Sequence, residues 1–260
     1  MDERLAGCAA KLERAEELHS QLEKEVNAYF KNHPPRIEGE WRPTKKQYVL
    51  IARVPVDPPL RWGVLLGDWA HNLRSALDLL LWQLVLLRGG EPTRRTQFPI
   101  FTNRARYRLW GRPMIDGVKR KDRGTLERMQ PYRNGRLKFV HPLAFLAWIS
   151  NLDKHREVHP PHLGLGGDWD GDLKDFSLNE DAGQIEKVTW GPGEGFRFYE
   201  GRELLRLRLS PRGAAPPVEA PEALGVVVSF SQRSVTLLTL DRIEVGVRDV
   251  FDVLGPEFDA

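Results

Sequence analysis

Six polar side chains that could serve acid–base chemistry or ligand binding lie close together in this 260-residue chain. The surrounding residues 60–88 are rich in leucine and tryptophan and are followed by Gly89-Gly90, a pattern that predicts a helix. At about 100° per residue the six fall within an arc of roughly 160° on that helix, opposite its apolar residues. They are Asp68, His71, Asn72, Arg74, Ser75 and Asp78.

A second polar group follows another apolar run, at residues 143–149. Pro142 suits the first turn of a helix there, and Pro160-Pro161 end it. Asn151 and His155 are four residues apart and share a helix face. Two apolar helices that each become polar near one end are natural packing partners, so we expect their polar segments to meet. The second group consists of Asn151, Asp153, His155 and Arg156.

The residue types in these two groups allow two functions. The one we favour is a hydrogen-bonded and ion-paired structural network, or a binding module without catalysis. The other is a metal-independent ribonuclease that resembles the HEPN family, which uses an arginine, a short spacer and a histidine. There His155 would be the acid–base group and Arg74 would stabilise the charged phosphorane, with His71 and Asn151 as further catalytic candidates. Ser150 stands where that family has its arginine.

Metal and cofactor chemistry fit these residues less well. His155 and His159 are spaced as two metal ligands on one helix face, but Lys154 and Arg156 beside them would repel a cation. The single cysteine, Cys8, can form neither an intrachain disulfide nor a cysteine zinc site. We therefore expect no bound metal and no cofactor.

Charge is distributed unevenly along the chain, whose net charge is +3. Residues 94–140, called the basic segment below, contain 14 lysines and arginines but three acidic residues, a net charge of +11. Residues 157–260 have a net charge of −9, so either these two parts face each other or the basic segment binds an anionic partner. Arginines for phosphates and aromatic rings for base stacking would make that partner nucleic acid. The aromatic residues of the segment are Phe98, Phe101, Tyr107, Trp110, Tyr132 and Phe139.

The order of the predicted elements favours an α+β fold. We expect a helical part over residues 1–162, with a short β segment and buried helices that form a small core. A mostly antiparallel β-rich part with a final helix follows over residues 163–260. The two parts either have separate cores or share one. Helices are predicted at 2–30, 60–88, 143–158 and 240–254, and a helical turn at 122–129. Strands are predicted at 48–54, 96–101, 187–190, 196–199, 204–209, 225–231 and 234–239.

Hydropathy along the chain predicts no membrane association. The longest nearly continuous apolar run, residues 79–87, is much shorter than the roughly 20 residues that a membrane-spanning helix requires. It is apolar on nearly every helix face, which predicts burial in a core instead. The start of the chain has no signal-peptide pattern, so we expect a cytoplasmic protein.

Three motifs resemble those of a group of bacterial hypothetical proteins, many of them from actinobacteria. The first is Gly67-Asp68 followed by residues 71–78 (HNLRSALD). The others are Gln130-Pro131-Tyr132 with Pro142-Leu143, and residues 151–156 (NLDKHR). The resemblance covers about residues 60–160. It implies a bacterial origin and no particular activity, because none is assigned to that group.

Overall fold

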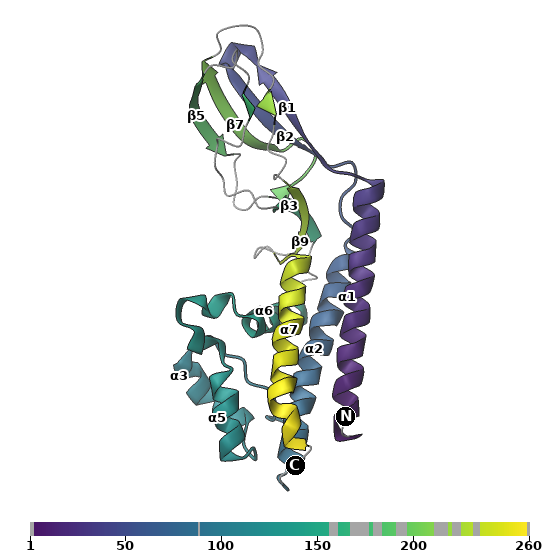
Figure 1. Ribbon diagram of the computed structural model, residues 1–260, viewed down its shortest axis with the longest axis vertical. Helices are drawn as coiled ribbons and strands as arrows, with labels where there is room; N and C mark the ends of the chain where they lie inside the picture. Colours follow the sequence, from purple (N-terminus) through teal and green to yellow (C-terminus); the bar gives the residue numbers. More distant parts are fainter. Residues whose placement is uncertain are drawn as a thin grey trace. The chain divides into compact units, whose positions relative to one another are not determined.

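The structure is a computed structural model with the α+β fold that the order of elements predicts (Figure 1). It describes residues 3–87, 89–155, 161–166, 177–178, 184–190, 197–210, 218–219, 225–230 and 235–258, with residues 152–155 described by their backbone alone. The chain divides into two compact units. The helical unit contains Met1–Glu23, Arg61–His159 and Leu237–Ala260, and the sheet unit contains Lys24–Leu60 and Pro160–Thr236.

Each unit is assembled from segments that lie far apart in the sequence. The expected boundary near residue 163 divides the chain once, whereas β2 (Gln47–Arg53) pairs with β7 (Glu203–Ser210) across that position. The last helix, α7 (Leu237–Leu254), belongs to the helical unit rather than to the strands that precede it. The physical reason is that β2 lies between β1 and β7, so the backbone groups on its second edge find partners in the later strand.

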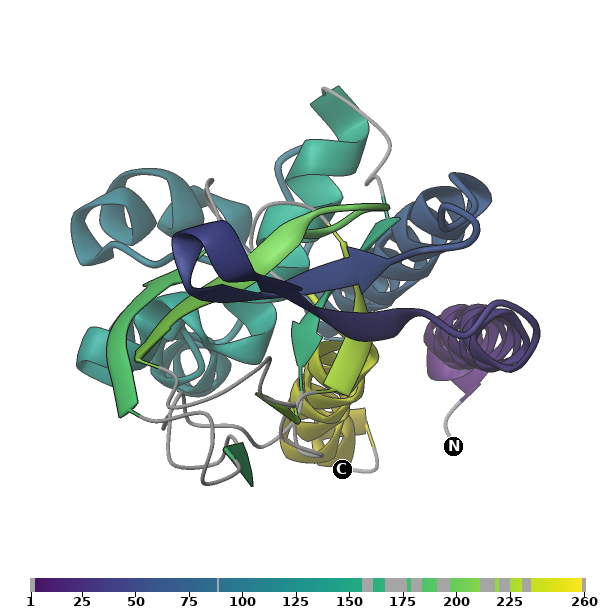
Figure 2. The ribbon, with the colours of Figure 1, turned by 90° about the horizontal axis from the view of Figure 1, so that it is seen from above.

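The helical unit consists of long helices joined by short helical segments. Helices α1, α2 and α7 lie beside each other in it (Figures 1 and 2). The long helices are α1 (Ala6–Asn32, as far as Glu23), α2 (Arg61–Leu86), α6 (Pro142–His155) and α7. The short ones are η1 (Glu3–Leu5), α3 (Arg104–Arg106), η3 (Tyr107–Gly111), α4 (Arg112–Met114), α5 (Arg120–Arg128), η4 (Pro131–Phe139) and η7 (Gly255–Phe258).

The spacing of apolar residues explains why α1 and α2 form and which faces they bury. Leu18 and Leu22 of α1 are four residues apart and buried, as are Trp69, Leu73 and Leu77 of α2. The helices predicted at 2–30 and 60–88 are thus confirmed. The predicted burial of the last turns of α2 is wrong in part.

The exceptions are Trp82 and Leu86, which are 39% and 45% exposed although Leu84 and Val85 between them are buried. A helix that is apolar on every face is buried only where a neighbouring element covers each face. In the described residues nothing covers the face that carries Trp82 and Leu86.

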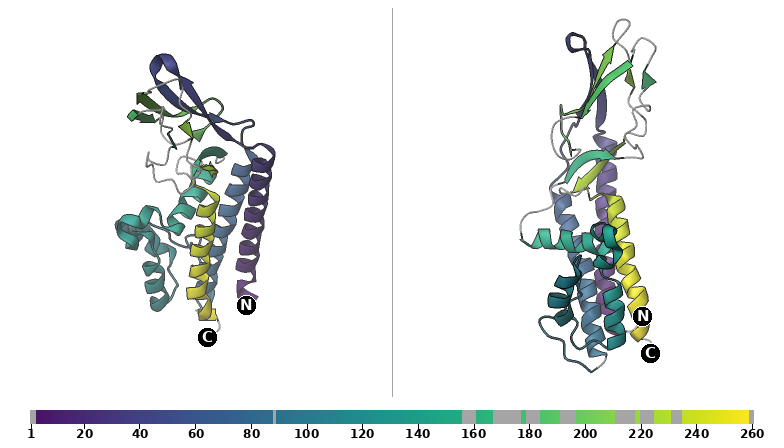
Figure 3. Two further views of the ribbon diagram at one scale, coloured as in Figure 1. Left: turned by 45° about the horizontal axis from the view of Figure 1, so that its top comes forward. Right: turned by 90° about the vertical axis from the view of Figure 1, so that its left-hand side faces the viewer.

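Helix α6 packs against both α2 and α7 (Figure 3). The approach to α7 is close because Gly246 has no side chain: a Cβ atom there would lie 2.5 Å from Cβ of Pro142, the first residue of α6. Pro142 is tolerated in that place because the first turn of a helix has no hydrogen bond for its nitrogen to make. The packing of α6 on α2 is the one that their two apolar runs predict.

A buried carboxylate, Glu244 of α7, joins three helices of this unit. Its Oε1 accepts hydrogen bonds from Nε1 of Trp69 on α2, at 2.8 Å, and from Nδ1 of His19 on α1, at 3.0 Å. Arg248, one turn further along α7, lies 3.9 Å from Oε2 and also pairs with Glu16 of α1. A buried carboxylate is stable only with such partners, so these contacts define how the three helices pack.

The sheet unit contains an antiparallel four-stranded sheet in the order β1–β2–β7–β5, which Figure 2 shows from above. Its remaining strands are β1 (Arg36–Arg42) and β5 (Gln184–Trp190), and η2 (Pro43–Lys45) connects β1 to β2. Five consecutive residues of β2 are buried, which explains the apolar run at 48–54. A three-stranded sheet contains β6 (Arg197–Phe198), β3 (Pro161–Gly166) and β9 (Gly225–Phe230), and a two-stranded sheet contains β4 (Ser177–Leu178) and β8 (Val218–Glu219).

Two of the predicted strands are wrong. Residues 96–101 join no sheet, and the N–H groups of Phe98 and Phe101 bond to side chains of the helical unit instead. Of residues 234–239, Val235 forms an isolated bridge with Phe230, and α7 begins at Leu237. The helix starts early because Leu240, Ile243 and Val247 continue an apolar spacing of three and four residues.

The pKa values of Glu244 and His19 are shifted in opposite directions. Burial alone would raise the pKa of Glu244, but the hydrogen bonds from His19 and Trp69 outweigh it and hold that pKa below its ordinary value. The hydrogen bond to Glu244 raises the pKa of His19, against the opposing effect of burial, and the carboxylates of Asp241 and Glu23 add to the increase.

These shifts set two pH limits on the stability that the pair contributes. The contribution of His19, whose pKa is raised on folding, is fully present below its ordinary pKa of 6.5 and is lost as pH rises through the raised value. The contribution of Glu244, whose pKa is lowered on folding, is present above 4.5 and is lost as pH falls through the lowered value. The pair therefore stabilises the helical unit most between pH 4.5 and 6.5.

We predict that the free energy of unfolding of the wild type falls between about pH 6 and about pH 9 by more than that of His19→Gln, which cannot take up the proton. Urea unfolding at the two pH values measures this difference. His71→Gln is the matched control, because His71 is exposed on α2 and its ring contacts the Ser75 hydroxyl rather than a carboxylate. Equal pH dependence in the wild type and His19→Gln would contradict the prediction.

Candidate functional site

Arg74 and Asp78 of α2 hold the backbone of Phe98. The Asp78 carboxylate Oδ1 accepts the Phe98 N–H at 2.8 Å, and Nη2 of Arg74 donates to the Phe98 carbonyl at 2.5 Å. The two side chains also pair with each other at 3.1 Å, one helical turn apart. Phe98 itself is fully buried. The N–H and the carbonyl of Phe98 therefore both have hydrogen-bond partners in the ion pair, as they would have in a neighbouring strand.

Gln130 likewise bonds to the backbone around Phe101, three residues after Phe98. Its Oε1 accepts the Phe101 N–H at 3.0 Å, and its Nε2 donates to the carbonyls of Pro99 and Leu126 at 2.8 and 3.0 Å. Gln130 is completely buried, so an unsatisfied amide there would be costly. Arg74 and Asp78 of α2, together with Gln130, thus hold residues 98–101 in place. Their side chains bond to backbone groups that a neighbouring strand would satisfy in a sheet.

Nη2 of the Arg74 guanidinium makes both of these contacts, to the Phe98 carbonyl and to the Asp78 carboxylate. Burial lowers its pKa, while the charge of Asp78 opposes that change. The group stays charged, since arginine is not deprotonated in proteins. A guanidinium that holds a carboxylate and a carbonyl is poorly placed to stabilise a phosphorane.

The other polar residues of α2 make separate contacts. Lys11 of α1 donates from Nζ to Oδ1 of Asn72 at 3.1 Å, and Nδ2 of Asn72 donates to the Asp68 carbonyl at 2.8 Å. The Asp68 side chain is exposed. The His71 ring is also exposed, 3.5 Å from the Ser75 hydroxyl. The six predicted site residues of α2 thus form three small groups rather than one.

Of the second predicted group (Asn151, Asp153, His155 and Arg156), the structure describes the side chain of Asn151 alone. Asn151 is exposed on α6, and Ser150 beside it is buried. Asp153 and His155 are described by their backbone alone, and Arg156 and His159 lie outside the described residues. The meeting of the two polar segments, and the catalytic roles of His155 and Asn151, therefore stay predictions.

The basic segment presents a different kind of site, made of exposed arginines. Arg94, Arg95, Arg104, Arg106 and Arg108 are all exposed, and within the described residues none of them has an acidic partner. Glu127 neutralises part of the segment's charge, because it lies 3.9 Å from Arg112 and 3.5 Å from Arg133. Lys121 pairs with Glu257 of the acidic C-terminal part, at 2.7 Å. Most of the positive charge therefore faces solvent.

The aromatic residues of the segment divide into core and surface. Phe98 and Tyr107 are buried and belong to the core. The Tyr132 hydroxyl donates to Glu127 at 2.9 Å, and its ring packs 5.6 Å from that of Tyr107. Trp110 and Phe139 are 61% and 52% exposed. Among the aromatic residues that suggested base stacking, these two have rings that a ligand could cover.

Trp110 is exposed because of a short π-helix, η3, at Tyr107–Gly111. Pro113 explains this irregularity, since the proline ring would clash with the carbonyl of residue 109 in a regular α-helix. Gly111 packs against two rings: a Cβ atom there would lie 2.7 Å from Tyr107 and 2.8 Å from Phe101. One side of η3 is thereby anchored in the core, and Leu109 and Trp110 are left on the outside.

A tight turn at residues 93–96 lies beside η3. Thr96 donates its N–H to the Thr93 carbonyl at 2.9 Å, and the Thr96 hydroxyl oxygen accepts from the Thr93 N–H at 2.9 Å. The Thr93 hydroxyl oxygen accepts from the Arg95 N–H at 3.2 Å. The backbone of Gln97 then bonds to the Met114 carbonyl at 3.4 Å. The turn is thus closed by its own side chains and tied to the helix that follows η3.

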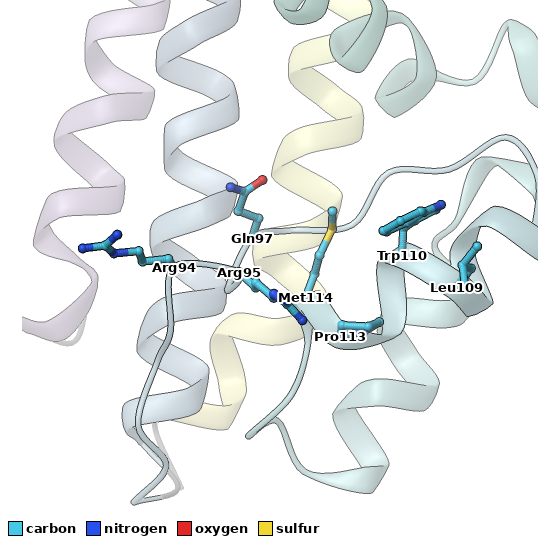
Figure 4. A pocket seen from close by; sticks show the side chains of 7 residues that line it. All are labelled: Arg94, Arg95, Gln97, Leu109, Trp110, Pro113 and Met114. Atoms are coloured by element: carbon cyan, nitrogen blue, oxygen red, sulfur yellow. The ribbon is translucent and has the colours of Figure 1, made fainter.

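The turn and η3 enclose a pocket of about 350 Å³ (Figure 4). Apolar side chains dominate the lining, and polar groups come from the turn. Figure 4 shows the Arg95 guanidinium extending toward Pro113 and Met114, whereas that of Arg94 points away from Trp110. The lining residues are Arg94, Arg95, Gln97, Leu109, Trp110, Pro113 and Met114.

Comparisons with protein-family models, with curated proteins and with solved structures return no match for this chain. Among the described residues, no group of three or more histidine, cysteine, aspartate and glutamate side chains could hold a metal ion. No helix formed by those residues is long and apolar enough to cross a membrane. The interpretation of the site therefore depends on its own geometry.

The sequence identifies the pocket residues only as parts of a charged, aromatic segment. It predicts base stacking by Trp110 but assigns no individual role to Arg95, Gln97 or Met114. The sequence does contain a signal, because Pro113 two residues after Gly111 disfavours a regular helix and threonines flank Arg94-Arg95. The proximity of the two stretches depends on tertiary contacts and has no local signal.

We predict that Asp78→Ala lowers the free energy of unfolding by about 2 kcal/mol, because the Phe98 N–H and the Arg74 guanidinium lose a charged partner. Urea unfolding measures the change. Asp68→Ala is the matched control, an exposed aspartate on the same helix, and should change stability by less than about 0.5 kcal/mol. If Asp78→Ala unfolds like Asp68→Ala, the Phe98 contacts do not stabilise the fold.

Proposed function

We propose that this chain is a non-catalytic module that binds single-stranded RNA through its basic segment. The observation that carries the proposal is the set of exposed arginines near the exposed Trp110 that have no acidic partner among the described residues. Guanidinium groups bind phosphate oxygens, and a tryptophan ring stacks on a base that is not already stacked in a duplex. On the strength of the motif resemblance we further propose a bacterial origin. We also propose a cytoplasmic location, which is consistent with an RNA ligand.

Within the described part of the helical unit, several exposed arginines of the basic segment lie apart from acidic side chains. This supports a role in binding rather than in folding. An arginine that serves the fold is buried or paired, as Arg74 is with Asp78. Arg104, Arg106 and Arg108 are exposed and have no acidic partner in the part of the chain that the structure describes, although they follow one another at intervals of two residues. Such a concentration of like charge destabilises a fold through repulsion, and an anionic partner relieves it.

The engagement of Arg74 supports binding without cleavage. The ribonuclease alternative needs a guanidinium beside the scissile phosphate, and Arg74 is occupied by Asp78 and the Phe98 carbonyl. His71, a further catalytic candidate, is exposed and contacts a hydroxyl rather than an orienting carboxylate. Neither residue lines the pocket beside Trp110.

We predict salt-sensitive binding of a labelled single-stranded RNA, measured by fluorescence anisotropy over a series of salt concentrations. Replacing Arg104, Arg106 and Arg108 together by alanine should reduce the slope of log K against log salt by about 2, since each phosphate contact contributes about 0.7. The control replaces Lys24, Lys31 and Arg36, which are exposed and lie outside the basic segment, and should leave the slope unchanged.

Two outcomes would contradict this function. No salt-sensitive binding by the wild type would exclude the basic segment as an RNA surface. Cleavage of the RNA that persists in EDTA and disappears in His155→Ala would favour the ribonuclease instead, and gel electrophoresis of the same samples detects it.

A further inference from the structure

We infer that the pocket beside Trp110 holds one nucleotide unit, with the base against the indole ring and the phosphate on Arg95. This inference rests on the proposed function and assigns a particular subsite to it. The pocket has about 350 Å³ of space, in the range of small-molecule sites. It lies within the helical unit, so its walls are placed by the contacts described above.

The apolar wall selects a flat, aromatic group. Trp110 and Leu109 are 61% and 64% exposed, an arrangement that leaves much apolar surface in water. The π-helix that presents them is itself less favourable than an α-helix, and such turns occur frequently at functional sites. Met114 and Trp110 both line the pocket, so a planar ligand there would meet an aromatic face and a polarisable sulfur.

The polar wall selects a negative charge next to that group. The Arg95 side chain has no acidic partner within the described residues, and the turn that carries it is closed by the hydroxyls of Thr93 and Thr96. Because the backbone of this turn is already ordered, binding a phosphate there costs little further conformational entropy. The Arg95 guanidinium extends into the pocket region, as Figure 4 shows.

Gln97 favours a base over other flat groups. Its side chain is exposed at the pocket, and its backbone is tied to Met114. A glutamine amide can exchange two hydrogen bonds with the edge of adenine, at N6 and N7. A base, a phosphate and their connecting sugar are the chemistry that matches all three features, and adenosine monophosphate (AMP) is the probe that contains them.

The same nucleotide chemistry could come from a free mononucleotide or from one residue of an RNA strand. We commit to the strand, because the exposed arginines of the basic segment continue beyond the pocket to Arg104, Arg106 and Arg108. AMP should then compete with a short single-stranded RNA for the protein, whereas a site for free nucleotide alone would bind AMP without displacing the strand.

The test titrates the full chain with AMP, adenosine and ribose 5-phosphate to roughly millimolar concentration, by calorimetry and by displacement of labelled RNA. AMP should bind more tightly than either fragment. Trp110→Ala should weaken AMP binding about ten-fold or more, because it removes the stacking surface. Arg95→Ala should weaken AMP but not adenosine.

The matched controls are Trp82→Ala, a partly exposed tryptophan on α2, and Arg136→Ala, an exposed arginine of the basic segment that does not line the pocket. Both should bind AMP as the wild type does. Thermal melting checks that Trp110→Ala and Arg95→Ala remain folded, as their exposure predicts.

The outcomes separate this inference from the proposed function. If RNA binds with the expected salt dependence but Trp110→Ala binds AMP and RNA like the wild type, the subsite is refuted and the RNA-binding function stands. If AMP binds through Trp110 without displacing RNA, the assignment to a strand is refuted. If AMP binding depends on Trp110 and RNA does not bind at all, the proposed function fails and the pocket is a site for free nucleotide.

Discussion

The packing of the basic segment depends on how the backbone of residues 98–101 is satisfied without a neighbouring strand. Buried N–H and carbonyl groups must find partners, and here Arg74, Asp78 and Gln130 provide them. The ion pair costs desolvation that is offset by three contacts, two to the backbone of Phe98 and one between Arg74 and Asp78. Loss of either charge would leave the other without its charged partner at a partly buried position. This constraint fastens the segment to α2.

The same constraint distinguishes Arg74 from several exposed arginines of the basic segment. Arg74 is inside, paired and committed to the backbone of Phe98. Arg95, Arg104 and Arg106 are outside, where the structure gives them no acidic neighbour in its described part. The motif at residues 71–78 thus contains residue types that are common in active sites, yet its charged members Arg74 and Asp78 stabilise the fold. The residues available for binding lie about 20 positions later in the chain.

Much of the fold can be predicted from local periodicity, because α1, α2 and α7 have apolar residues at helical spacing. The failure at residues 96–101 has a physical cause: Phe98 and Ile100 alternate as in a strand, but an alternating pattern does not say whether a ladder or side chains will satisfy the backbone. The polar groups of α2 were located by sequence, but their separation into three sets was not, since the partners Lys11 and Phe98 lie far from them along the chain. The link from His19 to Glu244 spans 225 positions and leaves no local trace.

The buried Glu244 and the exposed Trp110 both require a rigid helical unit, for different reasons. Glu244 requires α1, α2 and α7 to stay in one arrangement, since each supplies a partner or the carboxylate itself. Trp110 requires η3 to keep an apolar ring in water, an arrangement that persists only on a rigid support. The ring contacts of Gly111 with Tyr107 and Phe101 link η3 to the stretch that Gln130 holds, and Arg74 and Asp78 connect that stretch to α2. The polar network of α2 therefore reaches the pocket through packing, so a change at Asp78 can alter ligand binding although Asp78 touches no ligand.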